Sequence, residues 1–268
     1  MAFFLRRMGL AGLIGLFFVM TCLPIRSEET VKAESSAYAP GVNLWGRPGL
    51  ILGDSFERFA PGTWILSTHY AFQSFDSGEN VSLLPFGLTY MAADDLVFYA
   101  GDSYKLYNEG QGLNLLTAGG KWGIRLDDPA WQFSVGCDLS TGPASASLGS
   151  NSTDFIPTVT AAYVFSNGLL FNFEMGAYLP GDGLPPYIRF TPGFAYPLLS
   201  DVTALLELTG HQSQQGPNNP GSSMVLGIRG NGAIHLQGFF GLGTSGDAPS
   251  YYGGVSLLML SSLFEGFI

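Results

Sequence analysis

Apolar and polar residues alternate along the chain from about residue 60 onward. The segment 131–140 shows the pattern clearly, because every second residue is apolar: Trp131, Phe133, Val135, Cys137 and Leu139. The residues between them are Gln132, Ser134, Gly136, Asp138 and Ser140. Successive side chains of a β-strand point to opposite faces, so a period of two residues predicts strands with one apolar and one polar face.

Twelve segments carry this pattern, which predicts an all-β chain of about twelve strands. The predicted strands are residues 62–72, 82–91, 96–104, 113–127, 131–140, 154–165, 169–179, 186–197, 202–212, 222–229, 233–242 and 250–260. The third of them, 96–104, has an ambiguous phase. An even number of antiparallel strands places both ends of a closed barrel on one side of a membrane, as in bacterial outer-membrane barrels.

The predicted connections alternate between short and long. Ser166-Asn167-Gly168 and Gly230-Asn231-Gly232 are short and hold the residues that tight hairpin turns need for a positive φ. Longer polar connections include residues 141–153 and 213–221. Outer-membrane barrels have short turns in the periplasm and long loops outside, so the alternation assigns the two ends of the barrel.

The apolar face of the predicted strands is free of charge once the third strand is set aside. Aromatic residues fall near its periplasmic ends, where an aromatic girdle belongs: Trp64, Trp131, Tyr163, Phe165 and Tyr196. The opposite face holds Ser, Thr, Gly and Gln, whereas a soluble β-sandwich would expose Lys and Glu there. Charged residues make up 12% of the chain, about half the usual share. These features favour a transmembrane antiparallel up-and-down β-barrel over the sandwich.

The N-terminus has the pattern of a secretory signal. Arg6 and Arg7 precede an apolar stretch that ends at Ile25, and small residues at Val31-Lys32-Ala33 precede Glu34. A membrane-anchoring helix and lipidation at Cys22 are the alternatives. We expect cleavage and export to a Gram-negative-type cell outer membrane. The predicted division is a signal peptide (1–33), a periplasmic N-terminal segment (34–61), the barrel (62–260) and a C-terminal tail (261–268).

Cleavage would remove four basic and two acidic residues, which changes the formal net charge from −10 to −12. Such an acidic chain lacks the basic face that nucleic-acid binding requires. Cys137 would be the one remaining cysteine, so no intramolecular disulfide is expected. The expected partners are outer-membrane lipid, the barrel assembly machinery during biogenesis and an unidentified small-molecule solute.

Charged residues and histidines fall on the polar face, which barrel closure turns toward the lumen. A lumen-lining charged cluster at mid-height is predicted from Lys121, Asp138, Glu174, Arg189 and Glu207. The other residues predicted to face the lumen are Arg125, Arg229, His211 and His235. Because Glu174, Arg189 and Glu207 lie on three consecutive strands, they form either an internal salt-bridge network or a constriction that selects solutes by charge.

Neither a catalytic site nor a metal or cofactor site is expected. His211-Gln212-Ser213 has the His-x-Ser spacing of outer-membrane acyl hydrolases, whose pair must face the lipid, but the phase of its strand directs His211 and Ser213 inward. The three histidines are scattered, without paired ligands at a chelating spacing. The Gly-x-Gly fragments are followed by no helix that could bind a phosphate.

The run from Gly119 to Trp131, GGKWGIRLDDPAW, and the following SVGCDLSTG of residues 134–142 resemble the outer-membrane transporter family labelled "MetA-pathway of phenol degradation". Pro61-Gly62-Thr63-Trp64 is also similar. The resemblance is a pattern spread over residues 55–260, and it implies a barrel that passes small compounds, hydrophobic ones included. The C-terminus departs from the usual form, because Gly254-x-x-Leu257-x-Met259 resembles the assembly signal but residues 261–268 run past it.

Together these observations predict a passive outer-membrane channel or uptake barrel for small molecules, and not an enzyme. The alternative is a closed barrel with a structural or adhesive role through its extracellular loops. Twelve strands enclose a lumen between those of filled eight-stranded barrels and open porins, so the strand number does not decide between the two.

Overall fold

The structure is a computed structural model that describes residues 43, 60–75, 78, 80–107, 110–113, 116–141, 152–181, 185–213, 222–231, 234–245 and 249–261. These residues belong to one compact unit, Ser35–Ile268. The predicted signal peptide, most of the N-terminal segment and nearly all of the C-terminal tail lie outside them. No helix in the described residues is long and apolar enough to cross a membrane.

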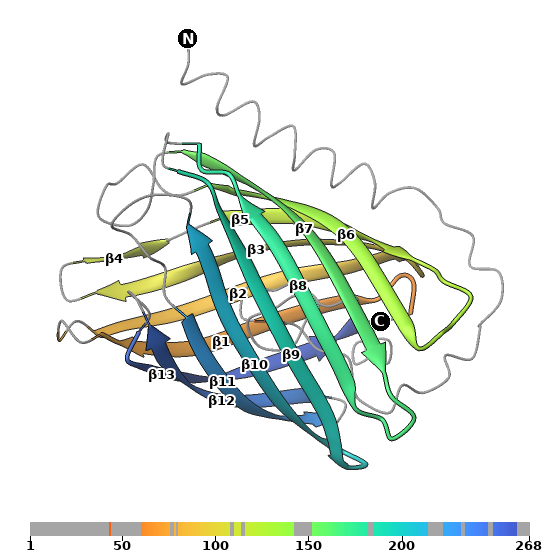
Figure 1. The fold of residues 1–268 in the computed structure, drawn as a ribbon. Helices are drawn as coiled ribbons and strands as arrows, with labels where there is room; N and C mark the ends of the chain where they lie inside the picture. Colours follow the sequence, from red (N-terminus) through yellow and green to blue (C-terminus); the bar gives the residue numbers. More distant parts are fainter. Residues whose placement is uncertain are drawn as a thin grey trace. The chain divides into compact units, whose positions relative to one another are not determined.

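Thirteen strands form one antiparallel sheet in this part of the chain (Figure 1). They are β1 (Trp64–Ser74), β2 (Asn80–Ala93), β3 (Leu96–Tyr107), β4 (Gly110–Leu113), β5 (Leu116–Ile124), β6 (Trp131–Thr141), β7 (Thr153–Val164), β8 (Leu170–Tyr178), β9 (Tyr187–Leu199), β10 (Val202–Ser213), β11 (Ser222–Asn231), β12 (Ile234–Ser245) and β13 (Tyr251–Leu260). The predicted strands agree with these bounds to within a few residues, with β5 as the predicted fourth strand. The short β4 was not predicted, since it shares only Leu113 with the predicted strand 113–127.

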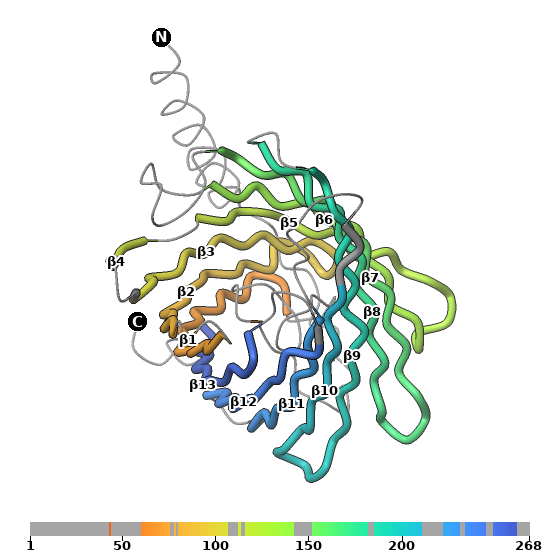
Figure 2. Tube along the Cα trace, turned by 60° about the vertical axis from the view of Figure 1, so that its left-hand side comes forward, coloured from red at the N-terminus to blue at the C-terminus, as the bar shows by residue number. Residues whose placement is uncertain are grey.

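The sheet closes on itself. Apart from β4 and β5, consecutive strands pair with each other, and β1 also pairs with β13 (Figure 2). β3 pairs with β5 over Leu96–Gly101 and with β4 over Tyr104–Tyr107, so β4 and β5 share one position in the wall. The predicted closed barrel of twelve antiparallel strands is therefore confirmed.

The two ends of the barrel differ in their connections. At one end, which we call the short-turn end, two to six residues join consecutive strands, and β1 begins and β13 finishes there. At the long-loop end, two residues join β3 to β4, and the other connections between paired strands that follow each other directly in the chain have five to eleven residues. The predicted tight turn at Ser166-Asn167-Gly168 is present, with Gly168 at a φ of 82° and the Asn167 Oδ1 accepting a hydrogen bond from the Leu169 amide.

Burial alternates along the strands, which separates an inner from an outer face. In β1, Ile65, Ser67 and His69 are buried, while Leu66 and Tyr70 are exposed. Every second residue therefore points into the barrel, as the period of two predicts.

The structure also determines the phase of the third strand, which the sequence pattern left ambiguous. Val97, Tyr99 and Ser103 of β3 are buried, so Asp102 lies on the outer face. Its Oδ1 accepts a hydrogen bond from the Ser103 amide at 2.6 Å. Asp102 is a charged residue on a face that is otherwise formed by apolar and uncharged side chains on the neighbouring strands.

Candidate functional site

The inner face of the barrel holds most of the charged residues that the sequence placed there. Lys121, Asp138, Glu174, Glu207 and Arg229 are each at most 2% exposed, and they come from β5, β6, β8, β10 and β11. Fully buried charges are costly unless they are paired or hydrogen-bonded. These groups therefore need polar partners.

Glu174 and Arg189 form an ion pair across β8 and β9. The Arg189 Nη2 donates to the Glu174 Oε1 at 2.5 Å, and the side chains are 15% and 0% exposed. The sequence predicted these two residues in a cluster with Glu207. In the register of β9 and β10, however, Glu207 lies opposite Gly193, while Arg189 lies opposite His211. Glu207 is thus four residues away from the level of Arg189, which the sequence spacing alone did not reveal.

A second polar contact joins β3 and β6, and β7 alone separates β6 from β8 in the sheet. The Tyr99 hydroxyl of β3 donates to the Asp138 Oδ1 of β6 at 2.5 Å, across the intervening strand β5. The residue of β5 between them is Gly119, where a Cβ atom would clash with both the Asp138 carboxylate and the Tyr99 ring. The glycine therefore permits the contact between strands that are not neighbours in the sheet.

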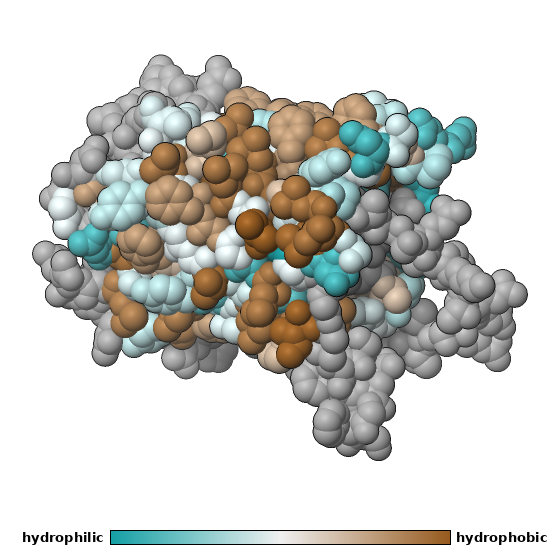
Figure 3. All heavy atoms as spheres, turned by 90° about the horizontal axis from the view of Figure 1, so that it is seen from below, coloured by the Kyte–Doolittle hydropathy of each residue, from teal (hydrophilic) through white to brown (hydrophobic). Residues whose placement is uncertain are grey.

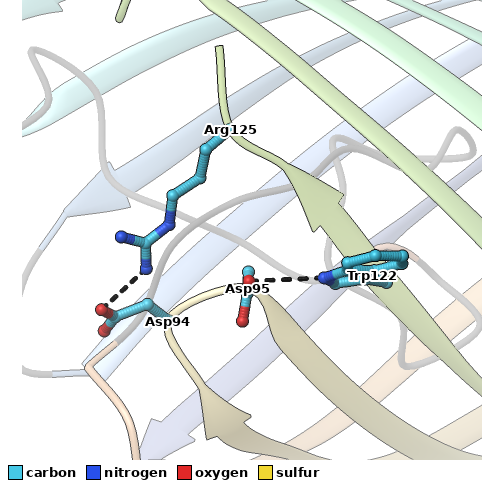
Figure 4. A network of polar contacts seen from close by, with 4 residues as sticks. All are labelled: Asp94, Asp95, Trp122 and Arg125. Carbon is cyan, nitrogen blue, oxygen red and sulfur yellow. Dashed lines mark hydrogen bonds and ion pairs between the residues drawn. The ribbon is translucent and has the colours of Figure 1, made fainter. Parts of the chain in front are cut away.

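The prediction that Arg125 faces the lumen is wrong. β5 ends at Ile124, so Arg125 lies in the turn at the short-turn end, where its Nη2 donates to the Asp94 Oδ2 at 2.9 Å (Figure 4). Both side chains are about half exposed, at 60% and 49%. Beside this pair, the Trp122 Nε1 donates to the Asp95 Oδ2 at 3.3 Å. The alternation of apolar and polar residues continues past Ile124, so the sequence pattern does not show that β5 ends there.

His235 and His211 are two further residues that were predicted to face the lumen. His235 of β12 faces inward and is 6% exposed. The backbone of His211 pairs with that of Arg189, but the side chains of His211 and Ser213 lie outside the described part of the structure. Among the described residues, no group of three or more His, Cys, Asp or Glu side chains could hold a metal ion.

Four polar side chains on adjacent strands form a line that we call the polar row: Arg229 (β11), Gln237 (β12), Ser256 (β13) and His69 (β1). Arg229 lies opposite Gln237, Gln237 opposite Ser256, and Ser256 opposite His69. All four are at most 2% exposed, and the Arg229 Nε donates to the Gln237 Oε1 at 2.9 Å. Only Arg229 of these four was singled out from the sequence.

An apolar band also crosses the inner face, and we call it the apolar ribbon. It consists of Ala162, Leu170, Ala195, Leu205, Val225, Phe239, Tyr252, Ala71, Leu83 and Val81, in order from β7 round to β2. Leu170 is the first residue of β8, at the short-turn end, and Val81 is the second residue of β2, at the long-loop end. The ribbon therefore runs from one end of the barrel to the other.

The pairing of the strands gives the ribbon its slope. Leu170 lies opposite Ala195, Ala195 opposite Leu205, and Ala71 opposite Leu83. From Leu205 to Ala71, each step is offset from the register by two residues, alternately toward one end of the barrel and the other. The ribbon as a whole therefore follows the direction in which strands pair, across the strand axes. Eight steps of about 4.8 Å between strands tilted by about 40° give a rise of about 25 Å, which equals the height of the apolar band on an outer-membrane barrel. The alternation in the sequence is enough to predict that these side chains point inward. That they lie next to one another depends on the register between strands, which the alternation does not determine.

The outer face is apolar. Exposed side chains there include Leu226 at 54%, Leu236 at 61% and Val255 at 60%, and apolar residues form broad patches on the surface in Figure 3. Aromatic residues gather at the short-turn end. Trp131 lies 4.8 Å from Tyr163 between ring centroids, and Trp64 stacks on Tyr90 at 4.3 Å. This is the arrangement of an interfacial aromatic girdle.

Comparison with known proteins supports the fold. The chain matches no protein-family profile, and no curated protein matches it in sequence. An outer membrane channel from Pseudomonas putida F1 matches with a TM-score of 0.60 and 12% identity, over 79% of this chain and 100% of that one. The NanC porin matches at 0.57 and 12%, over 73% and 98%, and the KdgM porin at 0.54 and 11%, over 72% and 98%.

These proteins are outer-membrane channels and porins, and the chain has their fold. At identities of 11–12% the likeness establishes the architecture alone. Because no family profile matches, the resemblance to the phenol-degradation transporter family is not confirmed.

Proposed function

We propose that the protein is a passive outer-membrane channel for small molecules that have an apolar part. The apolar ribbon is the observation that carries this proposal. The interior of a water-filled porin is polar, whereas this interior has a continuous apolar path between the two ends of the barrel. A solute with an apolar surface gains favourable contact along such a path at every step, so it need not leave one deep site to reach the next.

The outer face supports the membrane location. Its large exposed apolar side chains would be an aggregation hazard in water, whereas they are the expected surface of a barrel in lipid. Export past the inner membrane would follow from the predicted signal peptide. The fold shared with outer-membrane channels and porins fits this location, and the resemblance to the phenol-degradation transporter family is part of the same proposal.

A closed structural barrel is the second candidate, and one observation favours it. Glu174, Glu207 and Arg229 are 0% exposed, so these parts of the interior are closed to water in this structure. The proposed channel is accordingly narrow, and solute passage must move side chains along the ribbon. A structural barrel would have the same packing and no passage, which makes conductance the property that separates the two.

Replacing Phe239 with alanine should raise the single-channel conductance roughly twofold, because the change removes a ring from the middle of the ribbon and widens the path. The matched control is Phe240→Ala on the next residue of β12, whose side chain is on the outer face and 51% exposed, against 7% for Phe239. Both variants are measured in planar lipid bilayers beside the wild type. Currents absent from the wild type and from Phe239→Ala would favour the structural barrel, and an equal rise in both variants would place the path elsewhere.

A further inference from the structure

The polar row has unused hydrogen-bonding groups that face the interior. Within the described residues, the Nδ1 and Nε2 atoms of His69, the Nε2 of Gln237 and the Oγ of Ser256 have no hydrogen-bond partner. These atoms are on three adjacent strands, and each of the three side chains is 2% exposed. Buried polar groups in folded proteins nearly always have partners, so three unpartnered neighbours mark a place that a polar ligand can complete.

The orientation of the Gln237 amide follows from its contact with Arg229. The Nε of arginine can only donate a hydrogen bond, so the atom that meets it must be the Gln237 oxygen. The amide NH₂ of Gln237 is therefore directed to other groups. Together with the Ser256 hydroxyl and a ring N–H of His69, which every tautomer retains, it makes three donors beside the Arg229 guanidinium.

Apolar side chains lie directly beside this set of donors. Phe239 is two residues from Gln237 on the inner face of β12, and Ala71 is two residues from His69 on that of β1. Both belong to the apolar ribbon. A ligand whose polar group meets the row can thus place its apolar part on the ribbon.

We propose that the polar row and the adjoining part of the ribbon form a binding site for small amphipathic carboxylates, with the carboxylate on the row and the apolar body on the ribbon. An ionised carboxylate has no hydrogen-bond donor and accepts up to four hydrogen bonds. It therefore suits a set of donors that lies next to a guanidinium. Its role as a recognition point during passage rests on the proposed channel function. Because the row is shielded from water, binding requires neighbouring side chains to move, and we expect slow association.

Equilibrium dialysis of radiolabelled hexanoate against the purified full chain in detergent micelles tests the site, with empty micelles subtracted. We expect saturable binding of one hexanoate per chain. Acetate has the carboxylate without the apolar body, and hexan-1-ol has the body without the carboxylate. Each should compete at least about tenfold more weakly than unlabelled hexanoate, since each lacks one half of the contacts.

Ser256→Ala and His69→Leu should each weaken hexanoate binding about tenfold, the loss expected when a hydrogen bond to a charged group is removed. Ser140→Ala is the matched control, because Ser140 is also on the inner face and 1% exposed, but its hydroxyl already pairs with that of Thr117 at 2.9 Å. It should leave the affinity unchanged. Heat-modifiable migration on gels verifies that each variant is folded.

Three results would overturn the site: no saturable binding to folded wild type, equal competition by hexan-1-ol, or unchanged affinity in both Ser256→Ala and His69→Leu. The outcome is independent of the conductance measurement. A conducting barrel that fails to bind hexanoate retains the proposed function and loses the site, whereas a silent barrel that binds it retains the site and loses the channel.

Discussion

Replacing Val159 with arginine should destabilise the folded barrel in lipid by about 2–4 kcal/mol, the cost of an arginine on the lipid face at the bilayer midplane. Val159 lies in the middle of β7, opposite Val135, and next to Met175 on the other side. All three side chains are on the outer face, between 40% and 45% exposed. In a bilayer this position offers the guanidinium neither water nor a counter-ion.

Leu126→Arg is the matched control for this prediction. Leu126 is 46% exposed, against 45% for Val159, but it lies past the end of β5 in a turn at the short-turn end. Arginine near the membrane interface costs about 0–1 kcal/mol. Urea titration of barrels folded into lipid vesicles, followed by tryptophan fluorescence, measures both variants. Equal stability of the two would mean that the outer face of β7 does not contact lipid.

Arg189→Met should lower the free energy of unfolding by about 3–5 kcal/mol, since it removes the guanidinium partner of a buried carboxylate. The Glu174 side chain is 0% exposed and lies 2.5 Å from the guanidinium. The double variant Glu174→Gln with Arg189→Met should recover most of the loss, because the charge that needed the partner is then absent. In a conducting barrel, Arg189→Met should also shift the reversal potential toward cation selectivity.

The control for this pair is Arg125→Met, which breaks the exposed ion pair with Asp94. Its side chains are 60% and 49% exposed, and pairs of this kind contribute about 0–1 kcal/mol. A loss of stability as large for Arg125→Met as for Arg189→Met would contradict the assignment of Glu174 and Arg189 to the interior.

The period of two residues was sufficient to predict the strands and their inner and outer faces. It depends on local geometry, because each side chain of a strand points away from the next. The pattern failed at Arg125, because a turn begins there although the alternation continues by chance. It also did not determine which face of β3 points into the barrel. On that strand Asp102 interrupts the outer face, so neither alternating set of residues is free of charge.

The contacts of the interior could not be predicted in the same way. The pairing of Arg189 with Glu174 depends on how far each strand is shifted against the next, and no single strand encodes that shift. The contact of Tyr99 with Asp138 also needs Gly119 between them. The apolar ribbon was overlooked for a related reason: its members lie on nine strands, and only the register brings them into one line.

The central claim, that the outer face of this barrel lies in lipid, is tested most directly by the reactivity of Cys137. This thiol is unpaired and exposed on the outer face of β6, opposite Gly120 and Pro157 of the neighbouring strands. The measurement is labelling by a charged, membrane-impermeant maleimide after folding into lipid vesicles, with Cys22 replaced by serine. We predict negligible labelling until the protein is unfolded, because the reagent cannot enter the hydrocarbon. Rapid, complete labelling of the folded protein in vesicles would show that Cys137 faces water, and it would contradict the account.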